Sequence, residues 1–397
     1  MKFLQGFRKL SRDPQLLGVI FFAFFVNGMM STMLGALLPF MTSEYNLSYT
    51  LGGVAISAHQ LGNLFACFIS GFLPYVLGRK KTTVSLGSGL VIGSVLMTLT
   101  GNPAMILISF AATGIGRGVM SNISNAVVSE ITSDKTRSLN LLHATFAIGA
   151  FMAPFAAIFI TKTMQASWRI AAWIVALCSF IAMVVFVRSS LSNTPAVKDD
   201  AGSEAVGFLR SFRFWNVSAI LFFYLCCEAT MVGWLVSYFK DSGIMGTALA
   251  QSTSAILWIM ILIGRLVCAS FSKRINKSKL IIGMSIAITI FYALMISTRD
   301  IRIIFPCLMG LGLSMAGLYP TALSCMDSRF TSSTAAIGTC ISIATVGAIV
   351  MPIIVGTIAE KATIEAGMGA ISLALIAMLV FAVLNHITYK QPSVQEK

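Results

Sequence analysis

The sequence predicts an all-α membrane protein in which twelve transmembrane helices form two pseudo-symmetric six-helix bundles. Of the 397 residues, 57% are hydrophobic and only 11% are charged, whereas a soluble domain averages about 25% charged residues. Apolar segments of about 20 residues recur from end to end, and each is long enough to cross a hydrocarbon core about 30 Å thick as a helix. The chain also repeats itself at about half its length. Together these observations exclude a soluble domain for most of the chain.

Polar or charged residues flank each apolar segment and so define the ends of the predicted helices. The first segment follows a basic stretch that contains Lys2 and Arg12, as in a signal peptide. Its apolar run is longer than the roughly 7–15 residues of such a peptide, so we interpret it as an uncleaved first helix. The twelve predicted helices lie at about residues 15–40, 50–78, 82–100, 104–130, 137–163, 167–187, 214–239, 246–272, 279–298, 301–325, 332–358 and 364–388.

The two halves of the chain share short motifs. Gly149-Ala-Phe-Met-Ala-Pro154 returns as Gly347-Ala-Ile-Val-Met-Pro352, 198 positions later, and Gly114-Ile-Gly116 returns as Gly310-Leu-Gly312, 196 positions later. A common offset of about half the chain indicates an internal repeat. The longest polar stretch separates the two halves. We therefore expect an N-terminal six-helix bundle over residues 1–187, a cytoplasmic linker over 188–213 and a C-terminal bundle with a short tail over 214–397.

The net charge of +14 is distributed unevenly over the predicted connections. If the chain begins on the cytoplasmic side, the inner connections and ends contain 20 of the 28 Lys and Arg residues, and the outer connections contain six. This asymmetry follows the positive-inside rule. It predicts a multi-pass protein of the cell (plasma or inner) membrane with both termini in the cytoplasm. Because orientation accounts for the charge, nucleic acid is not an expected partner.

Glu228 is the one carboxylate in the middle of a predicted span. An ionised side chain at membrane depth costs about 3 kcal/mol or more, so such residues are candidate functional sites. Arg117 lies within the fourth predicted span and is a candidate partner. The pair could bind a substrate or form a static salt bridge. Burial favours the neutral carboxyl, whereas a nearby arginine favours the ionised form, so the sequence leaves the protonation state of Glu228 open.

Catalytic and metal-binding patterns are not expected in this chain. The eight cysteines show no metal-site spacing with the three histidines, and the histidines fall in three distant segments. The sequence has no phosphate-binding Gly-x-x-x-x-Gly-Lys-Ser/Thr loop, so a gradient rather than ATP hydrolysis would supply energy. We therefore expect neither an enzyme nor a bound cofactor or metal.

The segment Gly71-Phe-Leu-Pro-Tyr-Val-Leu-Gly78-Arg79-Lys80 resembles a loop motif of the major facilitator superfamily, Gly-x-x-x-Asp-Arg-x-Gly-Arg-Arg/Lys. Tyr75 and Val76 stand in place of its Asp and first Arg. The resemblance covers the whole chain and implies a transporter with a major facilitator fold and a solute site between the two halves. Finer matches resemble the branch that contains fucose permease and related sugar carriers. They comprise Asn140-Leu-Leu-His143 with Phe146, Gly149 and Pro154; Tyr224 and Glu228 with Trp234 and Tyr238; Trp258 with Gly264-Arg265; and Gly310-Leu-Gly312 with Tyr319-Pro320.

The resemblance also implies where the substrate binds. Spans 1, 4, 7 and 10 line the solute path in this superfamily, so Glu228 and Arg117 would face each other across it. The acidic residues that the proton-coupled fucose permease has in spans 1 and 4 are not found here: span 1 offers Asn27, and span 4 offers Arg117 and Asn122. Aromatic rings suit the CH faces of a sugar and amides suit its hydroxyls, although Trp234 could instead belong to the interfacial aromatic belt. The predicted substrate-binding residues are Glu228, Arg117, Asn27, Gln60, Asn63, Asn122, Asn125, Tyr224, Trp234, Trp258 and Tyr319.

Proton coupling and gating have separate candidates. Glu228 and His59 are the proton-coupling candidates, although His59 could also be a hydrogen-bonded packing residue. Spans 5 and 8 meet between the halves in this architecture, so we expect His143 and Arg265 to form a cytoplasmic gate, unless Arg265 extends to the membrane interface. Arg79 of the loop motif is a third gating candidate.

These features predict a secondary active transporter that moves a small polar solute, a sugar or sugar-like metabolite, by alternating access. Protons are the candidate coupling ion. The alternative is an efflux antiporter for drugs or lipophilic metabolites. The expected partners are the solute and the lipid bilayer, and the chain is expected to function as a monomer. Substrate identity and the direction of transport stay open.

Overall fold

The computed structural model describes residues 11, 13–132, 135–191, 207–271, 276–323, 325–326 and 334–388. Twelve helical segments in these ranges are long and apolar enough to cross a membrane, which confirms the predicted fold class. Two predicted ends differ by more than a few residues. Helix α2 (Pro14–Tyr45) continues past Pro39 and ends at Asn46, which has a left-handed backbone (φ 50°). Helix α3 (Tyr49–Phe72) stops earlier than expected because Pro74 starts a new short helix.

The first bundle contains the helices up to Arg188. Its third span is divided between two helices, and its fifth ends in a short π-helical turn. After α2 and α3 come α4 (Pro74–Leu77), α5 (Arg79–Gly87), α6 (Gly89–Leu99), α7 (Pro103–Ile131), α8 (Lys135–Ile158), η1 (Phe159–Thr163) and α9 (Arg169–Arg188).

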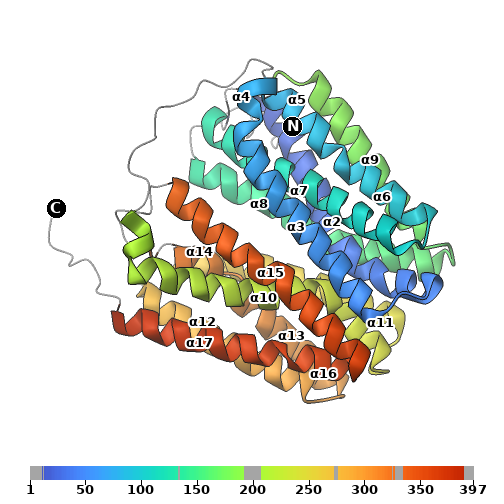
Figure 1. Cartoon of the computed structure of the whole chain (residues 1–397), viewed down its shortest axis with the longest axis vertical. Coiled ribbons are helices and arrows are strands. Elements are labelled where there is room, and N and C mark those ends of the chain that lie inside the picture. Colours follow the sequence, from blue (N-terminus) through green and yellow to red (C-terminus); the bar gives the residue numbers. More distant parts are fainter. Residues whose placement is uncertain are drawn as a thin grey trace.

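The second bundle begins after the 3-10 turn η2 (Gly207–Arg210). Figure 1 shows its helices, coloured from yellow-green to red, as a group separate from the blue and green helices of the first bundle. Its tenth and twelfth spans are each divided between two helices. Its helices are α10 (Phe212–Asp241), α11 (Thr247–Phe271), α12 (Lys277–Ile296), α13 (Ile301–Met315), α14 (Leu318–Leu323), α15 (Thr334–Lys361), α16 (Ile364–Gly369) and α17 (Ile371–Thr388).

Short polar side chains begin most of the long helices. Each accepts hydrogen bonds from backbone N–H groups of the first turn, which would otherwise lack partners. Asp13 caps α2 through the N–H of Leu16, and this bond together with the hydroxyl of Ser190 lowers the pKa of the Asp13 carboxyl. The other capping residues are Ser48, Asn102, Ser211, Asn276, Asp300 and Thr363.

Glycines let helices of one bundle approach at backbone distance. A Cβ atom on Gly149 of α8 would lie 2.0 Å from the carbonyl oxygen of Phe25 in α2. A Cβ atom on Gly347 of α15 would lie 2.3 Å from the carbonyl oxygen of Phe222 in α10. Small residues at such crossings allow the close packing that holds membrane helices together. The two glycines are 198 positions apart and their carbonyl partners are 197 positions apart, so a closely similar contact occurs in both bundles.

The structure corrects the alignment of the second repeat motif. A Cβ atom on Gly114 of α7 would lie 1.9 Å from the carbonyl oxygen of His59, and one on Gly312 of α13 would lie 2.8 Å from that of Leu257. His59 and Leu257 are also 198 positions apart. The counterpart of Gly114 is therefore Gly312 rather than Gly310, whose space is bounded by the Phe291 ring. One offset of 198 positions then relates both motifs.

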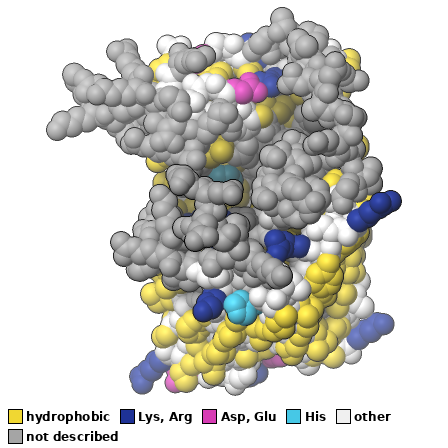
Figure 2. Space-filling view, turned by 90° about the vertical axis from the view of Figure 1, so that its left-hand side faces the viewer, with side chains coloured by type: hydrophobic (Ala, Val, Ile, Leu, Met, Phe, Trp, Pro, Cys, Tyr) yellow, Lys and Arg dark blue, Asp and Glu magenta, His cyan; other side chains and the backbone are white. Residues whose placement is uncertain are grey.

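Among the described residues, most contacts between the bundles join α3 with α15, α8 with α11, and α2 with α10, and α2 also contacts α11. We call the side that carries Asp13, Leu191, Phe212 and Thr388 the terminal face, and the side that carries Tyr49, Asp241 and Glu360 the opposite face. The bundles diverge toward the terminal face (Figure 1). Figure 2 looks at that side and shows a recess between the two bundles in which a histidine side chain is visible.

The predicted linker over 188–213 falls largely outside the described residues, so its boundaries stay a prediction. Near its start, the Lys80 ammonium donates to the carbonyl oxygen of Ser189 at 2.7 Å. At its end, the Arg213 guanidinium donates to the carbonyl oxygen of Thr388 at 3.1 Å. Each contact joins two segments of one bundle on the terminal face.

Candidate functional site

A cavity of about 260 Å³ lies between the two bundles. Helices α2, α3 and α7 line it from the first bundle, and α10, α11, α14 and α15 line it from the second. Its walls mix charged, amide, hydroxyl and aromatic side chains with aliphatic ones. The polar and aromatic lining residues are Ser31, His59, Gln60, Asn63, Arg117, Glu228, Trp258, Tyr319 and Thr345.

Glu228 and Arg117 line this cavity from opposite bundles. The ion pairs of the described residues, which have N–O distances up to 4.0 Å, do not include one between these two side chains. Glu228 is the one carboxylate among the described lining residues. The cavity therefore presents a hydrogen-bond acceptor from one bundle and a forked donor from the other, with room for a solute between them.

Neighbouring side chains hold the two charged residues in place. The guanidinium carbon of Arg117 lies 5.9 Å from the ring centroid of Phe146, a cation–π distance. The side-chain amide of Asn27 donates to the backbone carbonyl of Arg117 at 3.5 Å. On α10, the Tyr224 hydroxyl donates to the carbonyl oxygen of Met315 at 3.2 Å, and Tyr224 lies one helical turn before Glu228. Asn27 and Tyr224 thus lie beside charged lining residues and are not part of the lining themselves.

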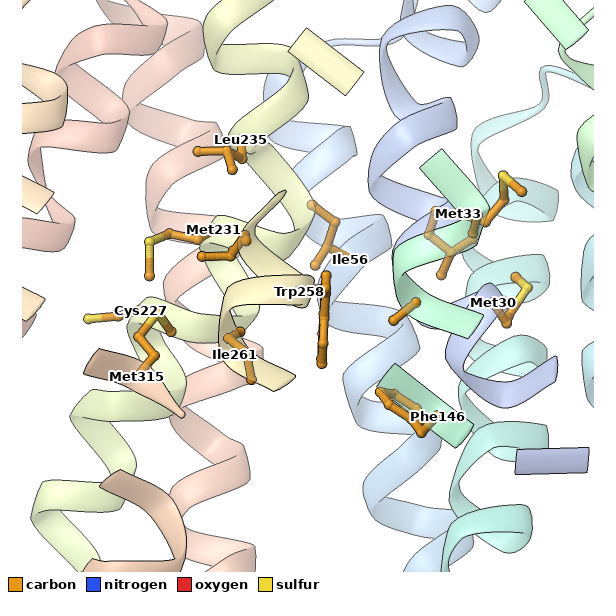
Figure 3. Packing of buried hydrophobic residues seen from close by; sticks show 14 of the residues in the cluster. Met30, Met33, Ile56, Phe146, Cys227, Met231, Leu235, Trp258, Ile261 and Met315 are labelled. Carbon is orange, nitrogen blue, oxygen red and sulfur yellow. The ribbon is translucent and has the colours of Figure 1, made fainter. Parts of the chain in front are cut away.

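Aromatic rings bound the cavity where the bundles meet. Figure 3 shows Trp258 of α11 between the bundles, near Ile56 and Phe146 of the first bundle. The ring centroids of Trp258 and Phe146 are 5.6 Å apart. Tyr319 of α14 lies beside Tyr224, with ring centroids 6.3 Å apart. The structure therefore places two of the predicted aromatic residues, Trp258 and Tyr319, where they can contact a bound solute.

Three other predicted substrate-binding residues lie away from the cavity lining. The Asn122 amide donates to the carbonyl oxygen of Cys67 and to the hydroxyl of Ser70, and the Asn125 amide donates to Ser121. Trp234 is fully buried, and its indole N–H lies 3.4 Å from the carbonyl oxygen of Pro352. In a membrane such polar groups need internal partners, and here backbone carbonyls supply most of them.

The three gating candidates lie in different surroundings. The His143 ring packs edge-on against Phe24, with centroids 5.4 Å apart. Arg265 lies on α11, the helix that packs against the α8 helix of His143. Arg79 of α5 forms an ion pair with Glu130 of α7, with one N–O distance of 2.7 Å. This ion pair joins two helices of the first bundle at the terminal face.

Sequence reasoning missed Ser31 and Thr345, which also line the cavity. Hydroxyl side chains in membrane helices commonly bond to a carbonyl one turn earlier, and Thr345 does so with Ile341 at 2.8 Å. Such residues look alike in a sequence whether or not they face a cavity. The repeat does not identify Ser31 and Thr345 either, because the residues 198 positions away from them are alanines.

The opposite face is closed by a cluster that we call the clasp, formed by Tyr49, Trp234, Asp241 and Glu360. The backbone N–H of Tyr49, at the N-terminus of α3, donates to the Glu360 carboxylate at 2.6 Å. The Tyr49 hydroxyl lies 3.2 Å from Asp241 Oδ2, and its ring centroid lies 6.0 Å from that of Trp234. Glu360 thus caps a helix of the other bundle. The positive end of the helix dipole also stabilises the negative charge of its carboxylate.

Removal of the clasp should open the opposite face. We expect Glu360→Ala to shift the equilibrium toward opening by about 1 kcal/mol, or roughly fivefold in population, because a charge-assisted cap between the bundles is lost. Distances between spin labels on the opposite-face ends of α3 and α15 measure this shift. Glu365→Ala is the matched control, because Glu365 pairs with Arg299 within the second bundle. An unchanged distance distribution in Glu360→Ala would show that the clasp does not hold the bundles closed.

Comparison with known proteins agrees with this architecture. A Buchnera aphidicola protein named Protein TsgA homolog is 20% identical over 355 residues, which cover 86% of this chain and 88% of that protein. The arabinose-proton symporter of Escherichia coli is 25% identical over 183 residues, or 44% of this chain and 37% of that protein. A crystal structure of the nucleoside transporter NupG matches the fold with a TM-score of 0.77 at 13% identity, over 95% of this chain and 100% of that one. The family model for the Major Facilitator Superfamily matches residues 20–346. The chain is therefore a multi-pass membrane transporter, not an enzyme, and belongs to the Major Facilitator Superfamily.

Proposed function

We propose that this transporter carries a sugar or sugar-like metabolite by alternating access and binds it in the cavity between the bundles. The observation that carries the proposal is the lining of that cavity. Glu228 and Arg117 lie on opposite bundles without an ion pair to each other, next to the amides of Gln60 and Asn63 and the ring of Trp258. A solute with several hydroxyls can bond to the charged and amide groups while its CH face packs on the ring.

The size of the cavity favours a small solute over a drug. Pockets for drug-sized ligands span about 300–1,000 Å³, and this cavity of about 260 Å³ lies below that range. The partial match to an arabinose-proton symporter and the motifs shared with the fucose permease branch support the same substrate class. We therefore propose sugar uptake ahead of efflux of lipophilic compounds.

The proposed coupling ion is the proton, and the proposed coupling site is Glu228. A carboxyl group that lines a cavity at membrane depth can bind a proton when the cavity opens to one side and release it when it opens to the other. The proposed orientation places both termini in the cytoplasm of a cell membrane, as the distribution of Lys and Arg indicates. We also propose that the chain acts as a monomer.

Uptake by proteoliposomes tests this function. We expect saturable, competable uptake of at least one of L-arabinose, D-xylose, L-fucose and uridine, and we expect an imposed pH gradient to accelerate it. The measurement is the initial rate with labelled solute, with and without the gradient, against protein-free liposomes. Efflux of lipophilic cations with no saturable uptake of these four solutes would instead support the antiporter alternative.

A further inference from the structure

The guanidinium of Arg117 is a cation without a counter-ion in the wall of the cavity. Arg117 of α7 is a lining residue and is partly exposed. Its guanidinium makes neither a hydrogen bond nor an ion pair with any residue that the structure describes. None of its nitrogens belongs to the fully buried polar atoms that lack a partner. The guanidinium nitrogens are therefore accessible from the cavity.

The packing of the first bundle fixes the position of this cation. Gly118, the next residue of α7, brings the helix to backbone distance from α3, because a Cβ atom there would lie 2.5 Å from the carbonyl oxygen of Asn63. The Phe146 ring centroid lies 5.9 Å from the guanidinium carbon of Arg117. Asn63 and Gln60 of α3 also line the cavity. This wall thus presents a positioned guanidinium with amide groups near it.

Positive charge exceeds negative charge around the cavity. Glu228 is the one carboxylate among the described lining residues. Arg117 and Arg265 both attract it electrostatically, and neither arginine forms an ion pair with a described residue. Arg265 lies on α11, outside the lining. Two guanidinium groups therefore share one carboxylate, which leaves one positive charge without a counter-charge.

Closure of the cavity around a solute would remove the water that solvates Arg117. An unpaired charge is costly at membrane depth, and it becomes less so when a bound group supplies the opposite charge and hydrogen bonds. A neutral sugar can accept hydrogen bonds from the guanidinium but brings no charge. A carboxylate brings a charge and two acceptor oxygens whose spacing matches the guanidinium fork. A solute with one carboxylate therefore satisfies Arg117 better than a neutral solute does.

We propose that the preferred solute is a sugar acid, whose carboxylate pairs with the Arg117 guanidinium and whose hydroxyl groups donate to Glu228. This inference rests on the proposed function and narrows it to hydroxylated solutes with one negative charge. Neutral sugars would bind through the same hydroxyl contacts, but more weakly.

Two matched pairs of solutes test the charge. In the pyranose form, D-galacturonate is L-arabinose with a carboxylate added at C5, and D-glucuronate is D-xylose with the same addition. Binding to the purified full chain is measured for both pairs at neutral pH. We expect at least one acid to bind about tenfold or more tightly than its sugar, as for a hydrogen-bonded charge pair. If neither acid binds more tightly than its sugar, the inference is wrong.

Two further solutes separate charge from size and from other anions. The methyl ester of D-galacturonate contains the added carbon without its charge, and we expect it to lose the preference. D-galactose 6-phosphate carries more negative charge, and we expect it to bind more weakly than D-galacturonate because the described lining contains one guanidinium. Equal binding of the acid and its ester, or tighter binding of the phosphate, would overturn the assignment of a carboxylate.

The result is distinguishable from failure of the proposed function. Saturable uptake of a neutral sugar, with no tighter binding of its acid, would reject the inference and retain the function. Tighter binding of an acid, with no uptake of any sugar or acid, would retain the contact with Arg117 and reject the function.

Variants of Arg117 locate the contact. Arg117→Gln removes the charge and the fork, whereas Arg117→Lys keeps the charge and loses the fork. We expect Arg117→Gln to abolish the preference for the acid over its sugar, and Arg117→Lys to retain part of it. A purely structural role would weaken the binding of acid and sugar alike and leave their ratio unchanged, which would contradict the inference.

Arg299→Gln is the matched control. Arg299 pairs with Glu365 on the opposite face, so this variant removes one positive charge by the same substitution without touching the cavity. We expect it to keep the preference for the acid. Loss of the preference in Arg299→Gln would show that net charge, rather than contact with Arg117, selects the acid, and the inference would fall.

Discussion

Glu228→Gln should weaken solute binding by about 10- to 100-fold and remove the dependence of uptake on the pH gradient. Hydrogen bonds to a charged group contribute about 1.5–3 kcal/mol, and each 1.4 kcal/mol is about a factor of ten in affinity. The substitution keeps the shape of the side chain and removes both its charge and its titration. Glu228 is also the one carboxylate among the described lining residues, so no other carboxylate in that lining can replace it.

The measurement combines equilibrium binding with initial rates of uptake in proteoliposomes, at several pH values and with an imposed gradient. Glu365→Gln is the control, because Glu365 lies on the opposite face, paired with Arg299. If Glu228→Gln left both binding and pH dependence unchanged, Glu228 would be a structural residue and the proposed site would be wrong.

Gly149→Ala and Gly347→Ala should each destabilise the folded protein by about 1–3 kcal/mol. The added Cβ atoms would lie 2.0 Å and 2.3 Å from backbone carbonyl oxygens of the neighbouring helices. A carbonyl inside a helix cannot rotate away, so the helices must separate, and overpacking of this kind costs about 1–3 kcal/mol. Because the two glycines occupy equivalent places in the repeat, we expect similar losses from both.

Thermal unfolding of the detergent-purified chain measures these losses. Gly18→Ala and Gly283→Ala are matched controls, since both glycines lie in helices and a Cβ atom there meets nothing within 4 Å. In those places alanine should raise stability by up to about 1 kcal/mol through helix propensity. If Gly149→Ala unfolded at the same temperature as the unsubstituted chain, the close contact between α2 and α8 would be wrong.

Most of the fold could be predicted from the sequence. The twelve spans were predicted from the lengths of the apolar segments, and the repeat was predicted from the glycine motifs. Both features can be read from the order of residues along the chain without knowledge of tertiary contacts. The counterpart of Gly114 in the second repeat could be identified only from the structure. Gly310 and Gly312 both lie near the expected position, and the contact of Gly312 with Leu257 distinguishes them. The end of α2 was also missed, because Pro39 is tolerated inside this helix.

The site was predicted most directly where charge made a residue unusual. Glu228 and Arg117 are conspicuous within apolar spans, and both line the cavity. The amide residues divide by the face of the helix that they occupy: Gln60 and Asn63 line the cavity, whereas Asn122 donates to Cys67 and Ser70. In a helix that is apolar on all sides, the hydrophobic residues show no periodicity, so the sequence does not indicate which face lines the cavity. The clasp involves α3, α10 and α15, so no local pattern reveals it.

The most direct test of the site is chemical labelling of a cysteine placed at Thr345, a lining residue of the cavity. In proteoliposomes, Thr345→Cys is exposed to a membrane-impermeant thiol reagent from either side, with the unsubstituted chain in parallel to subtract the native cysteines. We predict labelling from the terminal face and protection by whichever of the four test solutes is taken up. Labelling that a transported solute does not slow, or labelling from the opposite face alone, would contradict a substrate site in this cavity.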